Sequence, residues 1–294
     1  MRNTEKLARQ LFKAVVDDKI KNVKFLLRLG ANIHSIDDEE YEPIMYVKSK
    51  EMLEVLLANG ADVNFCSPLG DNLLMMVVDE QNLELVREIL KNDVNLKVKN
   101  FLGDDVLYKA VMWGNNEILK LLIEKGADVN TVYRDKQTKR EGDSILTVAV
   151  MRKNLEAVKL LVENGADVKY KVYGGWSPLM CAVEVQNYDI ARYLIEKGAE
   201  VNDVDNVGQS VLMHAVGVSD KAKEIVGLLL ANGADVEVKD IYGKDFYSVS
   251  KSLGAKGLID YVKKYKKSAN LLNERRNSEK NNFLSKMFDK LREM

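Results

Sequence analysis

The side chains that most often bind metals or act as nucleophiles are few in this sequence. Among 294 residues there are two histidines, His34 and His214, and two cysteines, Cys66 and Cys181. A metal site, a disulfide or a Cys–His catalytic pair would need these residues to come within a few ångströms of one another. Whether they can meet depends on the elements that hold them, so the pattern of the whole chain decides which chemistry is open to it.

Composition narrows the choice further. The sequence is 46% hydrophobic, which is too apolar for a disordered chain, and its 44 Lys and Arg nearly balance its 45 Asp and Glu. It holds no Gly-rich phosphate loop, nucleophile elbow or metal-binding helix motif. It also has neither a secretory signal nor the run of about 20 apolar residues that a membrane-spanning helix needs. We therefore expect a cytoplasmic protein, and export by a route without a cleavable signal stays open.

A short phrase, Gly-Ala followed by an acid or amide and then Val or Ile, recurs along the chain. With a degenerate copy at Asn92, neighbouring copies lie 30 to 39 residues apart. Each copy follows an apolar helical pattern, and its glycine can adopt the left-handed conformation that ends a helix. Self-similarity at this period indicates a stack of repeats rather than the two compact domains that length alone favours. The clear copies begin at Gly30, Gly60, Gly126, Gly165, Gly198 and Gly233.

A second pattern opens a helix about ten to fifteen residues after most copies of this phrase. It begins with a residue that caps helix N-termini well, followed by an apolar run that contains a small alanine. Pro178 falls at the first helical position, where its missing N–H costs nothing. Thr4 is expected to cap the first helix of the chain. The repeated caps are Asp105, Ser144, Ser177 and Ser210, and the alanines are Ala110, Ala149, Ala182 and Ala215.

These residues resemble the ankyrin repeat, a hairpin-like loop followed by two antiparallel helices. The resemblance implies an all-α fold with short β-hairpin loops, an ankyrin-repeat solenoid of stacked helix-turn-helix units. We expect the solenoid to span residues 1–265 and a basic tail to span 266–294. The expected repeats lie near 4–34, 35–64, 65–97, 98–130, 140–169, 170–202, 203–237 and 238–265.

The sequence departs from the ankyrin pattern at the start of the first helices, where the family carries Thr-Pro-Leu-His. The hydrogen bonds of that Thr and His should therefore be largely absent, and apolar packing should carry more of the local stability. Two repeats are irregular, because the stretch 41–60 is short and the phrase at Asn92 lacks its glycine. The family's histidine position holds Met45, Met75, Tyr108, Thr147, Met180 and Met213, and only Pro43 and Pro178 keep the proline.

The repeat also bears on the chemistry of the His and Cys residues. Packed helices lie about 8–10 Å apart, so stacking would separate His34 from His214 by on the order of 50 Å. Cys66 and Cys181 would lie about 30 Å apart, too far for a disulfide. Abundant carboxylates such as Asp128 fall at repeated positions, where turn and cap roles explain them. We therefore expect a monomeric chain with no catalytic activity, metal, cofactor or small-molecule substrate.

Ankyrin-like proteins bind partners with their hairpin tips and the inner face of their first helices, and the resemblance places those positions here. Both tryptophans fall among them, with a core role as the alternative, and aromatic residues dominate many interfaces. The predicted function is a protein–protein interaction module that binds its partner through this concave face. The predicted partner-binding residues are Phe101, Leu102, Met112, Trp113, Met151, Arg152, Tyr173, Trp176, Val185, Val207, Ile241 and Tyr242, accompanied by Asp104, Glu184, Gln209 and Val218.

Two additions interrupt or follow the repeats. Residues 131–141 form an extended, charged insertion, either a binding finger or a hairpin extension without a role. Residues 263–294 contain ten Lys and Arg against four Asp and Glu, and 283–291 carry an apolar stripe at helical spacing. That helix could cover the last repeat, or it could bind a partner or an anionic membrane. The alternative function is an adaptor or effector tethered to such a membrane, or to nucleic acid, by this basic tail.

Overall fold

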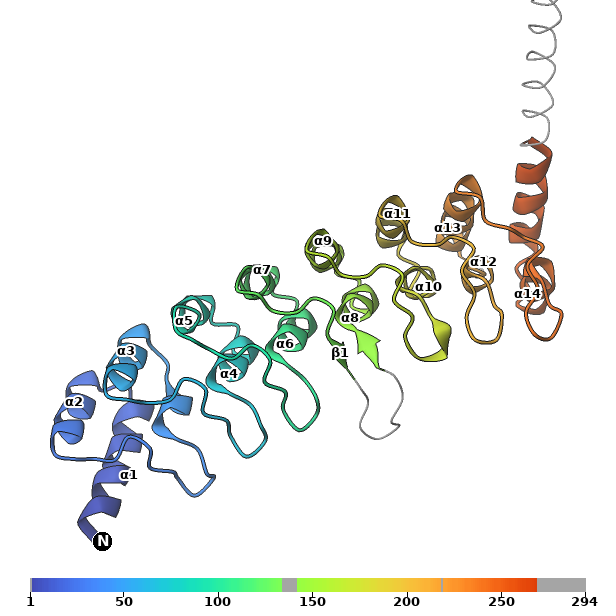
Figure 1. The fold of residues 1–294 in the computed structure, drawn as a ribbon. Helices are drawn as coiled ribbons and strands as arrows, with labels where there is room; N and C mark the ends of the chain where they lie inside the picture. The colour runs from blue at the N-terminus through green and yellow to red at the C-terminus, as the bar shows by residue number, and fades with distance from the viewer. Residues whose placement is uncertain (1, 134–141, 218, 269–294) are drawn as a thin grey trace, which may run out of the picture. The chain divides into compact units, whose positions relative to one another are not determined.

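The computed structural model describes residues 2–133, 142–217 and 219–268 (Figure 1). Contacts divide the chain into two compact parts, residues 1–173 and 174–294, which we call the N-terminal part and the C-terminal part. Each part is described by itself. The insertion residues 134–141, Val218 and the predicted helix over 283–291 lie outside the described residues.

The N-terminal part is built from pairs of short helices. Figure 1 shows their second helices in one row, their first helices in a neighbouring row, and the connecting loops projecting beyond the first helices. A two-stranded antiparallel ladder, β1 (Val132–Tyr133) and β2 (Asp143–Ser144), closes the base of the insertion. The helices are α1 (Arg2–Val16), α2 (Ile20–Arg28), η1 (Pro43–Tyr46), α3 (Lys50–Ala58), α4 (Leu73–Asp79), α5 (Leu83–Ile89), α6 (Val106–Trp113), α7 (Asn116–Glu124), α8 (Ile145–Met151) and α9 (Leu155–Glu163).

The C-terminal part repeats the same arrangement. A short turn of 3-10 helix, η2 (Tyr173–Gly175), lies at its N-terminal boundary. The last helix among its described residues covers 256–268 and runs three residues beyond the expected solenoid boundary at 265. The side chain of Lys266 on that helix donates to Glu237 Oε1 at 2.7 Å. The other helices are α10 (Pro178–Glu184), α11 (Tyr188–Glu196), α12 (Val211–His214), α13 (Asp220–Ala231) and α14 (Phe246–Ser252).

The predicted helix caps are present. Asp105, Ser144, Ser177 and Ser210 each accept a hydrogen bond from the backbone N–H three residues further on. Each bond satisfies one of the amides that a helix N-terminus leaves without a partner. Ser and Asp thus make the capping bond of the family's threonine, and the expectation that Thr-type bonds would largely be absent was wrong. The prediction that Thr4 caps the first helix was also wrong, because α1 begins two residues before Thr4.

Apolar packing replaces the family's histidine, as expected, at four of the six positions. Met45, Met75, Met180 and Met213 are all buried at that position, with at most 4% of their surface exposed. At the same position Thr147 is buried too, and its hydroxyl donates to Ser144 O at 2.7 Å. The alanines of the helix-opening pattern are also buried, at 2% exposure or less, so the first helices can approach their neighbours closely: Ala110, Ala149, Ala182 and Ala215.

The two irregular repeats are shortened in the structure. The stretch 41–60 has only the four-residue 3-10 helix η1 where the other repeats of the N-terminal part have an α-helix. The helix α5, which precedes the phrase without glycine, has seven residues, whereas α7 and α9 have nine each. Shorter helices bury less surface, so these repeats depend most on the neighbours that cover them.

Asparagine side chains connect successive copies of the Gly-Ala phrase. Nδ2 of Asn130 donates to Gly165 O at 3.0 Å, and its Oδ1 accepts from Asp167 N at 3.0 Å. Asn202 makes the same two bonds to Gly233 O and Asp235 N. Asn64 does so to the backbone of 93 and 95, even though that phrase has lost its glycine. The asparagine that directly follows the phrase therefore fixes the spacing between neighbouring loops within each part.

Replacement of Asn130 by alanine should lower the free energy of unfolding by about 1–2 kcal/mol, since two inter-repeat hydrogen bonds are lost. Urea denaturation followed by circular dichroism measures the change. Lys120→Ala is the matched control, because its side chain makes only an exposed ion pair with Glu124 at 3.9 Å. Such a pair contributes at most about 1 kcal/mol, and often nothing measurable. Equal stabilities for N130A and K120A would show that the asparagine bonds do not hold the repeats together.

Candidate partner-binding surface

The tips of the hairpin loops are organised by one side chain at the base of each tip. Oδ1 of Asn100 accepts from Leu102 N and Asp104 N, both at 3.0 Å. Asp205 and Asp240 accept from the amides two and four residues further on in the same way. These bonds satisfy amides inside each tip, so the tip keeps a fixed shape.

Neighbouring tips are joined to each other through their backbones. Phe101 N donates to Leu69 O at 3.0 Å in the N-terminal part, and Ile241 N donates to Val207 O at 3.0 Å in the C-terminal part. Gly70 has φ +83°, and a Cβ atom on it would lie 2.9 Å from Asn100 Cα, so only glycine permits this close approach. In each part, the two joined tips therefore form a row rather than independent loops.

Large apolar side chains stand exposed on both rows. Phe101 is 66% exposed and Leu102 74%, and Leu69 beside them is exposed as well. In the C-terminal part Ile241 and Tyr242 are exposed in the same positions. Leu69 was missed from the sequence, although its place just before Gly70 matches that of Leu102 before Gly103, which is the signal that could have identified it.

Trp113, at the end of the first helix α6, is held in place while its ring stays open. It is 56% exposed, so it is not a core residue, and its Nε1 donates to Asp79 Oδ1 at 2.8 Å. The other oxygen of Asp79 accepts from Lys109 Nζ at 2.6 Å, and Lys109 also lies 3.3 Å from Asp71 Oδ1. Burial alone would lower the pKa of Lys109, but the two carboxylates raise it above its ordinary value. The indole is thus fixed before any partner arrives.

The other tryptophan is more enclosed. Trp176 is half-buried, and its ring centroid lies 4.4 Å from that of His214. His214 Nε2 lies 3.0 Å from Asp205 Oδ2, and both of these side chains are less than 10% exposed. The histidine therefore stabilises the base of a hairpin tip through Asp205, and the Trp176 ring packs against the histidine ring.

The remaining predicted residues differ in exposure. Met151, Arg152, Tyr173 and Val207 are exposed, whereas Met112 and Val185 are half-buried. Nη2 of Arg152 donates to Met112 O at 3.1 Å, so neighbouring first helices of the N-terminal part are linked at this surface. The predicted residues of the N-terminal part thus lie on its tips and helix ends, and those of the C-terminal part lie on corresponding elements.

The remaining His and Cys residues, which the sequence offers as possible metal ligands or nucleophiles, are not grouped into a reactive site. His34 Nδ1 lies 3.2 Å from Glu42 Oε1. Cys181 is buried, and Cys66 is exposed with a pKa raised by partial burial and by the charges of Asp62 and Asp71, which disfavours its thiolate. Among the described residues, no three His, Cys, Asp or Glu side chains are grouped so as to hold a metal ion. No helix in the described ranges is long and apolar enough to span a bilayer.

The base of the insertion is anchored by a buried carboxylate. The hydroxyl of Tyr133 donates to Asp105 Oδ1 at 2.8 Å, and Tyr108 N donates to the same oxygen at 2.9 Å. Burial raises the pKa of Asp105, and these two donors offset part of that rise. Lys99 Nζ lies 5.1 Å from the centroid of the Tyr133 ring and donates to Val132 O. Tyr133 therefore ties the insertion to α6, a role that the sequence did not suggest.

The second oxygen of the tip carboxylate is satisfied from the first helix of the same repeat. Asp37 Oδ2 accepts from the Tyr46 hydroxyl, and Asp205 Oδ2 pairs with His214. Asp240 occupies the same place in the last repeat, but the residue nine positions further on, which is Tyr46 or His214 in those repeats, is Val249, which cannot donate. Oδ2 of Asp240 is buried without a hydrogen-bond partner among the described residues. This orphaned oxygen should cost the last repeat stability.

Comparison with known proteins gives a consistent result. A model of ankyrin repeats matches three stretches of the chain, residues 44–133, 132–205 and 174–240. An ankyrin repeat protein of Rickettsia felis is 28% identical over 127 residues, which are 41% of this chain and 42% of that protein. One of fowlpox virus is 31% identical over 127 residues, which are 42% of this chain and 18% of that protein. The matched region thus spans less than half the length of each of these relatives.

The fold also has a solved counterpart. The ankyrin repeat domain of Bcl-3, described as a unique member of the IkappaB protein family, is 24% identical with a TM-score of 0.67. The likeness covers 75% of this chain and 97% of that domain. It shows that the helix pairs and loops are arranged as in an ankyrin-repeat solenoid.

Tyr133→Phe should lower the free energy of unfolding by about 1.5–3 kcal/mol at pH 7, because the charged Asp105 loses a donor. Loss of that donor raises the pKa of Asp105 further above its unfolded value, so the deficit is full above the folded pKa. It should shrink as the pH falls through the folded pKa towards about 3.9. Urea denaturation at pH 7 and pH 4 measures both. Tyr108→Phe, which keeps its backbone donor, is the control, and a deficit independent of pH would contradict this account.

Val249→His should raise the free energy of unfolding by about 1 kcal/mol, because it supplies Asp240 with the donor that His214 gives Asp205. Val249→Leu is the matched control, since it fills similar space without a donor. Thermal and urea unfolding compare the two variants with the parent chain. A V249H protein no more stable than V249L would mean that the orphaned oxygen carries no cost.

Proposed function

This chain belongs to the ankyrin-repeat family, and we propose that it acts as a non-catalytic module that binds a protein partner through its hairpin tips and first helices. Ankyrin repeats are generally protein–protein interaction modules, and the fold is typically non-enzymatic. The partner would be recognised by contact with apolar and aromatic side chains on rigid backbone rather than by any chemical transformation.

The observation that carries this proposal is the gathering of exposed large apolar residues on one kind of element. Most exposed apolar residues of the described chain stand on hairpin tips or at the ends of first helices, although soluble proteins keep contiguous exposed apolar patches small. Aromatic anchors surrounded by such contacts are typical of interface hot spots. These residues include Leu69, Phe101, Leu102, Trp113, Met151 and Tyr173 in the N-terminal part, and Val207, Ile241 and Tyr242 in the C-terminal part.

Rigidity supports the same proposal. The tips are held by paired bonds to Asn100, Asp205 and Asp240, and the Trp113 indole is held by Asp79. A surface fixed in advance loses little conformational entropy when a partner binds, so more of the contact energy appears as affinity. Lys109 is already paired with Asp79 and Asp71. A partner that covers this surface would therefore not have to desolvate an unpaired lysine.

A tethered adaptor is the second candidate function. Lys263, Lys264, Lys266 and Lys267 are exposed on the helix over 256–268, at the end where the predicted basic tail begins. Clustered lysines attract anionic membranes and nucleic acids in a salt-dependent way. The capture experiment below separates this candidate from the first when it is repeated on a chain that ends after residue 268 and carries glutamine at these four lysines, since a tip-bound partner would be retained and a tail-bound one lost.

Trp113→Ala should reduce partner recovery at least tenfold, because the substitution removes an exposed, pre-positioned aromatic anchor. Hot-spot truncations commonly cost about 2 kcal/mol or more. Trp176→Ala should cost less affinity for the partner and more stability, since the Trp176 ring is half-buried against His214. Affinity capture with mass spectrometry identifies the partner, and titration of the purified partner gives the affinity.

The matched control is Tyr188→Ala, which removes an exposed aromatic ring from the second helix α11 rather than from a tip or a first helix. Circular dichroism confirms that each variant is folded. Unchanged affinity in folded W113A, or an equal loss in Y188A, would contradict binding through this surface.

A further inference from the structure

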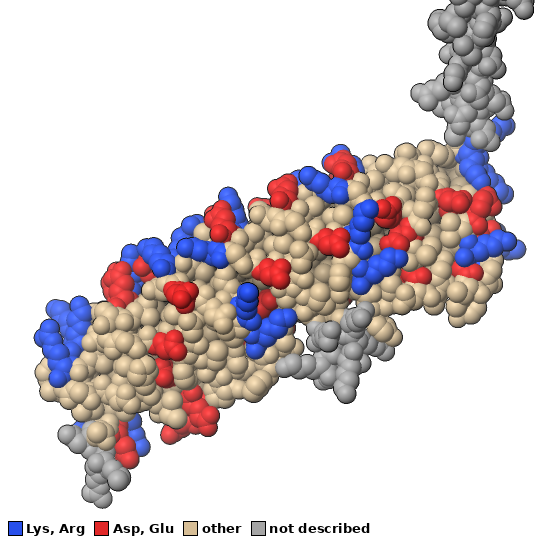
Figure 2. All heavy atoms as spheres, in the orientation of Figure 1, with Lys and Arg blue, Asp and Glu red and all other residues tan. Residues whose placement is uncertain are grey.

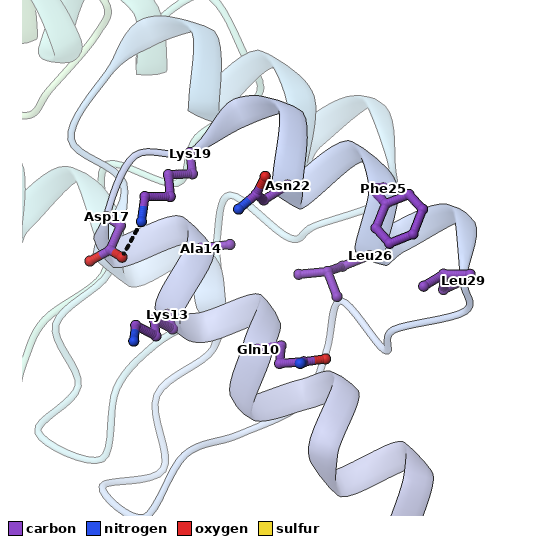
Figure 3. Close-up of a pocket in the computed structure, with 9 residues that line it drawn as sticks. All are labelled: Gln10, Lys13, Ala14, Asp17, Lys19, Asn22, Phe25, Leu26 and Leu29. Atoms are coloured by element: carbon purple, nitrogen blue, oxygen red, sulfur yellow. Dashed lines mark hydrogen bonds and ion pairs between the residues drawn. The ribbon is translucent and has the colours of Figure 1, made fainter.

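A hollow of about 450 Å³ lies between α1 and α2, away from the hairpin tips (Figure 3). Ala14 and Leu26 lie between the two helices, and Phe25 and Leu29 stand along α2 beside them. All nine lining residues come from α1, α2 and the turn that joins them, so no other described element closes the hollow. Phe25 is 61% exposed and Leu29 53%.

Leu29 is apolar at a position where the other repeats of the chain hold a polar residue. Residues aligned one position before the repeated glycine are polar in the other clear copies, whereas here the residue is leucine. In three repeats an asparagine there caps the preceding helix, for example Asn59 Nδ2, which donates to Val55 O at 2.8 Å. Leu29 occupies the same cap of α2 without a side-chain donor. The aligned residues are Asn59, Lys125, Asn164, Lys197 and Asn232.

Phe25 departs from its repeat equivalents as well. The aligned residues, four positions before those caps, are half-buried or buried: Val55, Leu121, Leu160, Tyr193 and Leu228. Phe25 is a larger apolar residue and yet lies mostly in solvent. Leucine at this position loses the side-chain hydrogen bond that caps the helix, and the exposed Phe loses the stabilisation of burial. This helix pair is therefore destabilised twice at the same hollow. Such a local departure is expected where a surface serves a function.

The two helices that form the hollow carry an excess of basic residues. Residues 2–28 contain eight Lys and Arg against three Asp and Glu, while the whole chain has a net charge of −1. Lys13 and Lys19 stand at the rim of the hollow, and Lys19 donates to Asp17 at 3.1 Å (Figure 3). Figure 2 shows Lys and Arg gathered over this end of the N-terminal part. The rim therefore favours a ligand of negative charge.

We propose that this hollow receives an acidic amphipathic helix of a protein partner, at a site separate from the hairpin tips. A groove between two helices accepts the apolar side of a third, with contacts at the spacing of one helical face. The lining residues on the α1 side run from Gln10 to Asp17, about 10 Å, which matches about two turns of a bound helix. Apolar residues of the ligand would contact Phe25 and Leu29, and its carboxylates would face the lysines of the rim.

The probe is a fluorescein-labelled 15-residue peptide with leucines along one helical face and glutamates elsewhere. Its matched counterpart carries lysines in place of the glutamates. Fluorescence anisotropy should show the acidic peptide binding the full chain at least tenfold more tightly than the basic one, with affinity falling as salt rises. Leu29→Asn should weaken this binding at least tenfold. It should not lower the melting temperature, because it restores the cap found at Asn59.

Leu69→Asn on a hairpin tip is the control variant, and it should bind the acidic peptide as the parent does. Equal binding of both peptides, or unchanged binding by L29N, would overturn the proposal. So would a dimer in sedimentation velocity that L29N abolishes, since a second copy would then occupy the hollow. Binding to phosphatidylserine vesicles that L29N abolishes, without peptide binding, would assign the hollow to a membrane instead. Each of these outcomes leaves the function proposed for the hairpin tips untouched.

Discussion

Burial of each helix pair against the pairs beside it is the interaction on which the rest of this structure depends. A pair of seven- to nine-residue helices such as α4 and α5 is too short to be stable alone, and it becomes stable only when its apolar side is covered. The fully buried Ala149 and Ala182 permit close approach of the first helices, and methionines fill the position where the family carries histidine. Every loop is therefore attached to a support that its neighbours maintain.

That support explains why the polar residues of the chain serve structure before function. Asn130 and Asn202 set the distance between successive loops, and Asp205 and Asp240 shape the tips. The pair formed by His214 and Asp205 would suggest catalysis in another setting, but here it completes a turn. What the chain offers to solvent at its tips and first-helix ends is apolar and aromatic surface, held by a hydrogen-bonded scaffold underneath.

The same logic gives meaning to departures from the repeat. Where an internal repeat holds Asn59, the first helix pair holds Leu29, and where Asp205 has His214 nine residues further on, Asp240 has Val249. Both exchanges lose a hydrogen bond, but only the first creates exposed apolar surface beside a basic rim. The bond missing at Asp240 exposes no apolar surface and only weakens the last repeat. The bond missing at Leu29 accompanies an exposed apolar hollow, which is why we propose a ligand there.

The sequence by itself determined the repeat, the helix caps such as Ser177 and the family resemblance, because these depend on local periodicity and on residues whose preferences act within a few positions. It also pointed to Trp113 and Phe101 as surface residues. It could not reveal that Trp113 is pinned by Asp79, that Tyr133 anchors the insertion to Asp105, or that Asp240 lacks a donor. Only the tertiary structure decided these points, since each depends on which side chains from different repeats meet in space.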